Sequence, residues 1–554
     1  MRGNTKHLVF SVCVAFVLYA FASVASARTI YVPDDYAKIQ WAVDNAFAGD
    51  TIIVRDGIYY ESITVSKQLT IKSENGSAYC IVNGTGSDVF TLKADGIRIE
   101  GFTITGGGYG IYIRSNKNMI INNTISSNNY DGIFLCSNNN SISNNNISSN
   151  NDEGIHLCGS NNNISNNEFI NDGLFVYYSY GNIVENNKVN GKPLFYLEEE
   201  SDKIIDNAGQ IILVKCKNIT VMNSELTNTD VGIELWQSDN CLISKNNISN
   251  NSDGIFLWHS NNNSISNNNI SSNKCGIFLW HSNNNNISNN TISSNKFDSI
   301  YLDDSNNNSI SENNISSNNY GIFLYKSNNN IIYLNNFINN TYNAFSQNST
   351  NIWNSKEPIK YTYRGSKFKN YMGNYWDDYN GSDANGDGIG DISYGINADK
   401  DNYPLIERFE HYFLPTLAKI FDTGRPENPY PSISGEFIGT IKTDKKVIAT
   451  KLYTYACEGT GGHTEHALIW NKTWCAEAKW EGYKGDWMNI SFNRTVVLMP
   501  HETYNITIVT GSYPQIHHTS SLKTENGWIN CTEFTDANGK KYYEDWIPAI
   551  MLWS

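Results

Sequence analysis

Beyond residue 27 the sequence lacks any apolar run long enough to cross a membrane, because a helical span needs about 20 consecutive apolar residues. The longest candidate, Leu8–Ala22, has only about 15 residues. It follows Arg2 and Lys6 and is followed by small residues that end at Ala27, which is the pattern of a secretory signal. We therefore expect residues 1–27 to be a signal peptide. The mature chain should be secreted or held at the cell surface, without a transmembrane segment.

Positive charge is also scarce. The chain has 40 Lys and Arg against 55 Asp and Glu, a formal net charge of -15. Loss of Arg2 and Lys6 with the signal would lower the net charge by two, to -17. An acidic surface repels phosphate backbones, so nucleic acid is not an expected partner, and free polyanionic sugars are disfavoured as well.

Helical periodicity is missing from the middle of the chain, where a unit of about 22 residues repeats instead. Each unit has three short apolar stretches (Ile-x-Leu, then Asn-x-Ile twice) separated by Asn, Ser and Gly, which is typical of short strands joined by tight turns. A Gly-Ile pair opens the units, beginning at Gly110, Gly132, Gly154, Gly232, Gly254, Gly276 and Gly321. Three strands per coil predict a parallel β-helix, in which only stacking of coils buries the Ile and Leu side chains.

Asparagine suits the turns of such coils because it tolerates a left-handed backbone. Equivalent residues in successive coils, such as Asn246, Asn268 and Asn290, should also form hydrogen-bonded ladders along the axis. Cys136 and Cys158 occupy equivalent places one coil apart, within reach of a disulfide. The pattern leaves open whether they are bonded or are simply two stacked small residues.

The start of the mature chain contains a strand, a short amphipathic helix and a second strand, which would cap the first coil. This opening, the 22-residue coils and the irregular stretch 189–221 resemble secreted β-helix proteins of the NosD type, also called the carbohydrate-binding and sugar-hydrolase repeat group. The resemblance covers about residues 28–405. It implies a right-handed parallel β-helix, and the group includes binders, carbohydrate enzymes and proteins of unsettled role.

The end of the chain changes in composition, and regularly spaced short strands predict a β-sandwich. Its LMPHETYNITIV stretch resembles the corner of fibronectin-type or carbohydrate-binding sandwiches, with Tyr504 tying the corner. The fold class is therefore all-β. The predicted boundaries are a cap at 28–72, coils at 73–350 with an insertion at about 189–221, a closing cap at 351–412, a linker at 413–435 and a sandwich at 436–554.

The outward face of the coils is rich in aromatic residues. In Gly-Ile-Phe-Leu-Trp, period-2 alternation points Ile and Leu inward and Phe and Trp outward. Stacked rings ~4.8 Å apart would form a continuous stripe that can pack against sugar rings. The predicted glycan-binding residues are Trp236, Phe256, Trp258, Phe278, Trp280 and Tyr325. The alternative is that the ladder stabilises the sheet or is covered by the C-terminal domain or another subunit.

Catalysis on this face would need carboxylates that flank a glycosidic bond. His281, Asp303 and Asp304 have suitable chemistry. The sequence lacks Asn-Thr-Asp, Gly-His-Gly or Arg-Ile-Lys strings like those of pectin hydrolases and the Asp-Pro-His-Asp string of alginate epimerases.

A structural calcium site is predicted where the coils end. Alternating oxygen ligands and a turn-forming glycine match the first nine positions of a calcium loop, although the twelfth position is Tyr394 rather than Glu. The predicted ligands are Asp383, Asn385, Asp387, the carbonyl of Ile389, and Asp391. An ion-free turn is the alternative.

The resemblance also suggests copper, because NosD-type proteins are often labelled copper-binding. The sequence offers His259 and His281 one coil apart, but only 7 methionines and no compact His/Met/Cys cluster, so its residues do not support copper.

Together these observations predict a secreted or cell-surface protein that binds polysaccharide or another surface polymer through its aromatic face, without catalysis. The alternatives are a polysaccharide hydrolase or lyase, an architectural envelope protein, and a NosD-like copper-binding protein.

Overall fold

The computed structural model describes residues 27–397, 399–413, 420–472, 474–482, 487–543 and 545–553. The predicted signal peptide, apart from Ala27, therefore lies outside the described residues. The chain divides into two compact units, Met1–Lys360 with Lys369–Phe409, and Tyr361–Phe368 with Glu410–Ser554. None of the helices that the structure describes has both the length and the apolar character that a membrane crossing requires.

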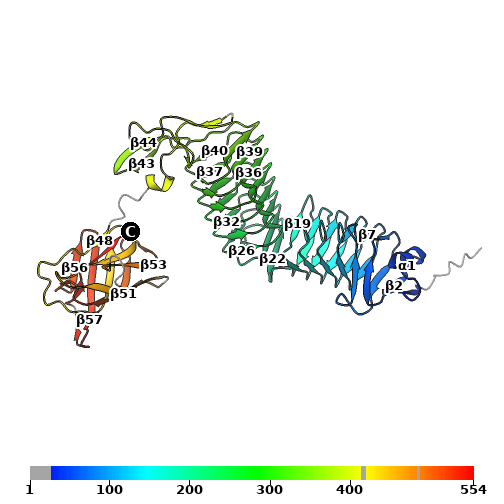
Figure 1. Ribbon diagram of the computed structural model, residues 1–554, viewed down its shortest axis with the longest axis horizontal. Coiled ribbons are helices and arrows are strands. Elements are labelled where there is room, and N and C mark those ends of the chain that lie inside the picture. Colours follow the sequence, from blue (N-terminus) through cyan, green and yellow to red (C-terminus); the bar gives the residue numbers. More distant parts are fainter. Residues whose placement is uncertain are drawn as a thin grey trace, which may run out of the picture. The chain divides into compact units, whose positions relative to one another are not determined.

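The first unit begins with β1 (Thr29–Val32), α1 (Ile39–Asn45) and β2 (Thr51–Val54). Helix α1 buries Ile39, Ala42 and Val43 in the same apolar core as the first coils. The helix lies at the blue end of the coils in Figure 1 and covers apolar side chains that no preceding coil could cover.

Successive coils then build a parallel β-helix with three sheets, as the sequence predicts. We call residues 29–189 the first segment. Its Gly-Ile strands are β4 (Ile63–Val65), β7 (Phe90–Leu92), β10 (Ile111–Ile113), β13 (Ile133–Leu135), β16 (Ile155–Leu157) and β19 (Leu174–Val176). The second sheet runs from β1 to β20 (Ile183–Glu185), and the third from β3 (Gly57–Tyr60) to β21 (Lys188–Val189).

Registers within the sheets place identical residues above one another. Ile133 pairs with Ile111 and with Ile155, and all three are fully buried. The predicted asparagine ladder is confirmed: the Asn246 amide nitrogen donates to Asn268 Oδ1, and the Asn268 amide nitrogen donates to Asn290 Oδ1, both at 3.0 Å. Such ladders let polar side chains lie inside the coils without unsatisfied hydrogen-bonding groups.

The repeat breaks at a hairpin between β21 and β22 (Lys192–Glu198), whose strands are antiparallel. A second segment, residues 192–376, begins there, and Figure 1 shows the coils changing direction between β19 and β22. Its Gly-Ile sheet consists of β22, β24 (Gln210–Val214), β27 (Val231–Trp236), β30 (Asp253–Trp258), β33 (Cys275–Trp280), β36 (Asp298–Asp303), β39 (Tyr320–Tyr325) and β42 (Tyr342–Gln347). The other two sheets run from β23 (Ile204–Ile205) to β40 (Ile331–Tyr333) and from β26 (Glu225–Thr227) to β45 (Tyr375–Trp376).

The last coil is closed by a hairpin of β46 (Tyr394–Ile396) and β47 (Asp399–Asp401). Trp376 stacks between Phe337 and Tyr394, with ring centroids 4.4 and 4.3 Å away. Buried Asp401 accepts hydrogen bonds from Asn374, at the end of an asparagine ladder, and from the Trp376 indole. The final ladder step therefore has an acceptor although no further coil follows.

The second unit is mainly one antiparallel sheet around its own apolar core. The strand order is β48 (Phe421–Asp422), β60 (Ile550–Trp553), β50 (Val447–Thr454), β53 (Asn489–Leu498), β52 (Cys475–Lys479), β51 (His463–Trp470), β54 (Thr503–Gly511), β49 (Gly435–Thr443), β57 (Gly527–Asp536) and β56 (Ser521–Thr524). Buried Tyr504 accepts a hydrogen bond from the Met499 backbone at its hydroxyl, in the manner of the predicted corner. The β-sandwich itself stays a prediction.

Candidate functional site

The two segments of the β-helix meet at β19, the edge strand of the first Gly-Ile sheet. An edge strand leaves unpaired N–H groups, which must be covered or hydrated. The Leu174 amide donates to Gln210 Oε1 at 3.0 Å, and the Val176 amide donates to Glu234 Oε2 at 3.2 Å. Side chains from β24 and β27 therefore take the place of the next parallel strand, and the aromatic faces of the two segments come into contact.

Aromatic rings from both segments pack at this contact. Tyr177 stacks on Trp258 with ring centroids 5.0 Å apart and an interplanar angle of 8°, and Tyr178 meets Trp258 edge-on at 4.2 Å. The ring centroids of Phe175 and Phe256 are 6.1 Å apart. These contacts tie the bend together because buried aromatic pairs combine large apolar area with favourable ring geometry.

The sequence predicts one continuous exposed stripe, and the structure corrects this for three residues. Trp236, Phe256 and Trp258 are 3, 4 and 0 % exposed. They point away from their own sheet as alternation requires, but the first segment covers them. Period-2 alternation assigns a side chain to a face of its sheet and does not reveal what packs on that face.

Side chains of both faces also line a cleft of about 680 Å³, which we call the aromatic cleft. One wall comes from the first segment and the other from the second. The lining residues are Phe134, Cys136, His156, Cys158, Phe175 and Tyr177 on the first wall, and Asp253, Phe256, Phe278, Trp280, Tyr301 and Asp303 on the second. Cys136 and Cys158 form a disulfide, which resolves the alternatives that the sequence left open.

Stacking along each wall keeps the rings in order. Phe278 lies parallel to Tyr301 at 4.8 Å and 13°, and Phe134 stacks on His156 at 5.0 Å. Phe278 and Trp280 are half-buried, so their outer surfaces face the cleft. Tyr325, one coil beyond Asp303, is not among the described residues that line it.

Carboxyl groups gather at the same bend. The ligand atoms of Asp131, Glu153 and His156 all lie within 4.8 Å of one another, and His156 Nδ1 is 3.8 Å from Glu153 Oε2. Burial, and then the neighbouring Glu153, raise the pKa of Asp131. Burial opposes ionisation of Glu153, but hydrogen bonds with His156 and Asp131 lower its pKa overall. The pair therefore holds one proton and one negative charge at neutral pH.

Further buried acids belong to the second segment. Asp230 accepts the Gly154 and Gly173 amides, each at 3.0 Å, and burial raises its pKa well above the ordinary value. Burial raises the pKa of Asp253 to about 7, while the charge of Lys274 opposes this rise. Sequence reasoning missed these acids because they come from distant coils and share no motif. The signal that the sequence does contain is Glu234, an acid at the outward position where the neighbouring Gly-Ile coils have an aromatic residue such as Phe256 or Phe278.

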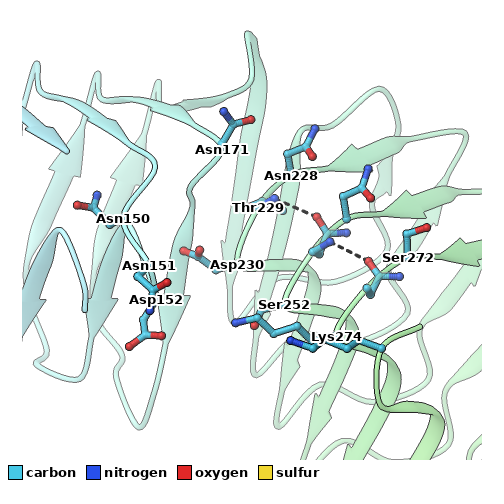
Figure 2. Close-up of a pocket in the computed structure, with 14 residues that line it drawn as sticks. Asn150, Asn151, Asp152, Asn171, Asn228, Thr229, Asp230, Ser252, Ser272 and Lys274 are labelled. Atoms are coloured by element: carbon cyan, nitrogen blue, oxygen red, sulfur yellow. Dashed lines mark hydrogen bonds between the residues drawn. The ribbon is translucent and has the colours of Figure 1, made fainter. Parts of the chain in front are cut away.

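A polar groove of about 380 Å³ also lies at the bend. Figure 2 shows Asn150, Asn151 and Asp152 on one side of it and Thr229 and Lys274 on the other. The remaining lining residues are Asn171, Asn228, Asp230, Asn250, Asn251, Ser252, Ser272, Asn273 and Lys296. Amides and hydroxyls both donate and accept hydrogen bonds, so the groove presents a surface suited to polyhydroxylated molecules.

Of the three predicted catalytic residues His281, Asp303 and Asp304, Asp303 alone is among the described residues that line the aromatic cleft. Asp303 lines the cleft, and its pKa is raised by burial and then by Asp304, with His281 and Lys326 opposing the rise. The ring of His281 stacks on that of His259, with ring centroids 5.0 Å apart and an interplanar angle of 7°. The structure brings His281 and Asp303 near each other, and their catalytic role stays a prediction.

The predicted calcium loop forms a tight turn in which its carboxylates accept the loop's own amides. Asp383 accepts the Asp387 and Gly388 amides at 3.1 and 2.9 Å, and Asp391 accepts the Ala384 amide at 2.8 Å. Asn385 Oδ1 accepts the Asp387 amide at 3.0 Å. Ile389 is buried and bridges to Leu405. Calcium itself stays a prediction.

Comparisons with known proteins identify the β-helix. The family described as "Periplasmic copper-binding protein (NosD)" matches residues 43–196 and 194–381. A cell surface glycoprotein of Methanothermus fervidus is 38% identical over 125 residues, which are 22% of this chain and 21% of that protein. The chain thus spans about a fifth of the length of this curated relative.

Similar solved structures include polysaccharide-modifying enzymes at low identity. The A-module of the mannuronan C-5 epimerase AlgE6 of Azotobacter vinelandii is 14% identical, with 56% of this chain and 92% of that chain covered and a TM-score of 0.30. A PL6 alginate lyase in complex with a trisaccharide is 15% identical, with 62% and 91% covered and a TM-score of 0.28. Likeness at this level carries no argument about activity.

The copper in the family's description can be tested against the donors of this chain. Among the described residues, the one group of three His, Cys, Asp or Glu side chains with close ligand atoms is Asp131, Glu153 and His156. It offers one imidazole and two carboxyls, and it contains no thiolate. Cys136 and Cys158 are bonded to each other, and the stacked rings of His259 and His281 are 5.0 Å apart. These donors do not fit a copper centre.

Proposed function

This chain belongs to the NosD family of β-helix proteins and is a secreted or cell-surface protein, and from this premise we propose that it binds a polysaccharide in the aromatic cleft. The observation that carries the proposal is the cleft itself, which has aromatic rings on both walls and few polar groups. Ligand sites of this kind supply apolar contact from rings and orientation from a small number of polar groups.

The half-buried rings supply the contact surface. Trp280 and Tyr301 extend along successive coils of one wall, and Phe134 faces them from the other segment. Flat rings match the C–H faces of pyranose units, and coils ~4.8 Å apart repeat at a spacing close to that of an extended sugar chain. A polymer along this wall would therefore meet the equivalent rings of Phe256, Phe278 and Tyr301 at three successive coils.

Polar groups at the bend supply hydrogen bonds. Asp253 and Asp303 line the aromatic cleft, and the amides of the polar groove lie at the same bend. Sugar hydroxyls need such partners, because a hydroxyl that loses water without a replacement hydrogen bond weakens binding.

Gel filtration of fluorescently labelled polysaccharides with the mature full-length protein tests the proposal. Panels should include neutral glucans, acidic polymers and amino polymers. We expect co-elution at unchanged polymer length, and Trp280→Ala should weaken binding at least tenfold because it removes one wall ring. Tyr325→Ala is the matched control, since Tyr325 belongs to β39 of the same sheet but is not among the described residues that line the cleft, and it should leave affinity unchanged.

Two other outcomes would replace the proposal. Shortened polymer would assign the cleft to a hydrolase or lyase and direct attention to Asp303, His281 and the Asp131–Glu153 pair. Unchanged elution across the whole panel would favour an architectural role, in which the aromatic rings only join the two segments.

A further inference from the structure

The charges around the aromatic cleft narrow the class of sugar that it can accept. Its described lining includes two carboxyl groups, Asp253 and Asp303, and no Lys or Arg, and His156 is the single lining residue that can become a cation. The mature surface as a whole is also acidic. A polyanionic sugar entering the cleft would meet like charge on its walls without a basic partner.

The aromatic rings add to this preference. The face of an aromatic ring carries partial negative charge and attracts a cation held within about 6 Å of its centre. Trp280 stacks on Trp258 through one face, and Asp303 takes the equivalent place one coil further on, toward the other face of Trp280. Phe278 and Tyr301 stack on each other, and the Tyr301 hydroxyl lies 3.5 Å from Asp303 Oδ2. Rings combined with a carboxylate form the surroundings that bind an ammonium group.

The two carboxyl groups differ in their neighbours and in their burial. Asp253 has a nearby cation in Lys274, which lines the polar groove. Asp303 has the like charge of Asp304 beside it, which raises its pKa, while His281 and Lys326 act in the opposite direction, and Lys326 also packs over the Tyr325 ring at 4.9 Å. Asp303 is half-buried, so it is the better placed of the two to receive a cation from a ligand.

We propose that the aromatic cleft selects sugars that carry free amino groups, with Asp303 receiving the ammonium and the rings of Phe278, Trp280 and Tyr301 surrounding it. This inference rests on the proposed function, because it names the class of glycan for the same cleft. Ammonium recognition favours hexosamine polymers over neutral glucans, and it excludes polyuronates.

Isothermal titration of the full-length protein with chain-length-matched oligosaccharides tests the inference. The probes are fully deacetylated chitohexaose, fully acetylated chitohexaose and an alginate hexamer. We expect the deacetylated probe to bind at least tenfold more tightly than the acetylated one, and the alginate hexamer not to bind. The preference should fall as salt rises, because the ion pair is partly exposed.

Substitutions separate this inference from the proposed function. Asp303→Asn should abolish the preference for the deacetylated probe while leaving the affinity for the acetylated probe unchanged. Asp206→Asn, at an exposed carboxyl of the same β-helix outside the lining, is the matched control and should preserve the preference.

Other binding results would contradict the ammonium inference, the proposed polysaccharide binding, or both. Equal binding of the two chitohexaoses, both weakened by Trp280→Ala, would overturn the ammonium inference and leave glycan binding intact. Tighter binding of alginate than of either chitohexaose would overturn it too. Hexalysine serves as a fourth probe. If it binds more tightly than the deacetylated chitohexaose, the ligand whose ammonium groups the cleft accepts is a basic peptide and not an amino sugar, and the inference is overturned. Absence of binding by every one of these probes would overturn the ammonium inference, whereas the proposed function fails only if the whole polysaccharide panel, neutral glucans included, does not bind.

Discussion

Replacing Asp172 by Asn should stabilise the first segment of the β-helix above neutral pH. Asp172 is fully buried at the end of an asparagine ladder, where its Oδ2 accepts the Asn150 backbone amide at 3.1 Å and the Asn150 side-chain amide at 2.9 Å. Its Oδ1 has no hydrogen-bond partner. An ionised carboxylate in this position therefore has one oxygen that is neither hydrated nor bonded.

The size of the effect follows from the pKa of Asp172. Burial raises this pKa from 3.8 to about 7, with Asn150 opposing the rise and Glu153 adding to it. The folded state therefore binds more protons than the unfolded state between those values, and stability falls as pH rises through about 7. At about 1.4 kcal/mol per pKa unit, the loss is of order 4 kcal/mol above pH 7.

The introduced amide would avoid this loss. Its oxygen can accept both bonds from Asn150, and its nitrogen takes the place of the unpartnered oxygen. Elsewhere in the ladders that nitrogen donates to a carbonyl one coil back, as Asn167 does to Ile142 at 3.0 Å. We expect Asp172→Asn to raise the free energy of unfolding by about 1 to 4 kcal/mol at pH 8 and by little at pH 4, where the native carboxyl is protonated.

Urea unfolding followed by circular dichroism at pH 4, 6 and 8 measures this dependence. Asp206→Asn is the matched control, because Asp206 is an exposed carboxyl of the same β-helix, and it should change nothing. Asn150→Asp, which removes an amide donor from the middle of the ladder, should destabilise the protein at pH 8. Destabilisation by Asp172→Asn at pH 8, or the same gain at every pH, would refute the reasoning.

Two further predictions concern the bend and the end of the β-helix. Trp258→Ala should lower the free energy of unfolding by about 3 to 5 kcal/mol because it empties a fully buried site between the segments, and a urea midpoint equal to that of the native protein would contradict the packing described for the bend. We also propose that the loop Asp383–Asp391 binds calcium: calcium should raise the melting temperature, and Asp387→Ala should remove that rise while Asp206→Asn preserves it. Titration with calcium that releases no heat and leaves the melting temperature unchanged would refute the site.

Much of the fold could be predicted from the sequence because a β-helix repeats one short pattern of residues, and each coil contacts mainly the coils next to it. A period of about 22 residues fixes which residues stack, and stacking alone buries Ile133 between Ile111 and Ile155. The same period placed Asn246 above Asn268 in the ladder. Neighbouring coils interact through short-range rules, so the pattern of one coil predicts its contacts with the next.

The bend followed no such rule. The hairpin between β21 and β22 moves the Gly-Ile strands from one sheet to another. Phe175 in β19 and Phe256 in β30 therefore belong to different sheets, although both are outward-facing residues of Gly-Ile strands. The break in the period at 189–221 signals that something changes, but no periodicity predicts the direction of the coils after it. The carboxyl groups of Asp131 and Glu234 were missed for the same reason.

The sequence by itself therefore determined the β-helix, its asparagine ladders, its family and the side chains that leave the outer face of each sheet, because these depend on contacts between consecutive coils. Only the tertiary structure decided that the two aromatic faces meet, that Trp258 is buried while Trp280 lines a cleft, and that acids from distant coils gather beside it. The physical reason is that β19 ends a sheet with unpaired amides, and long-range contacts with Gln210 and Glu234 satisfy them.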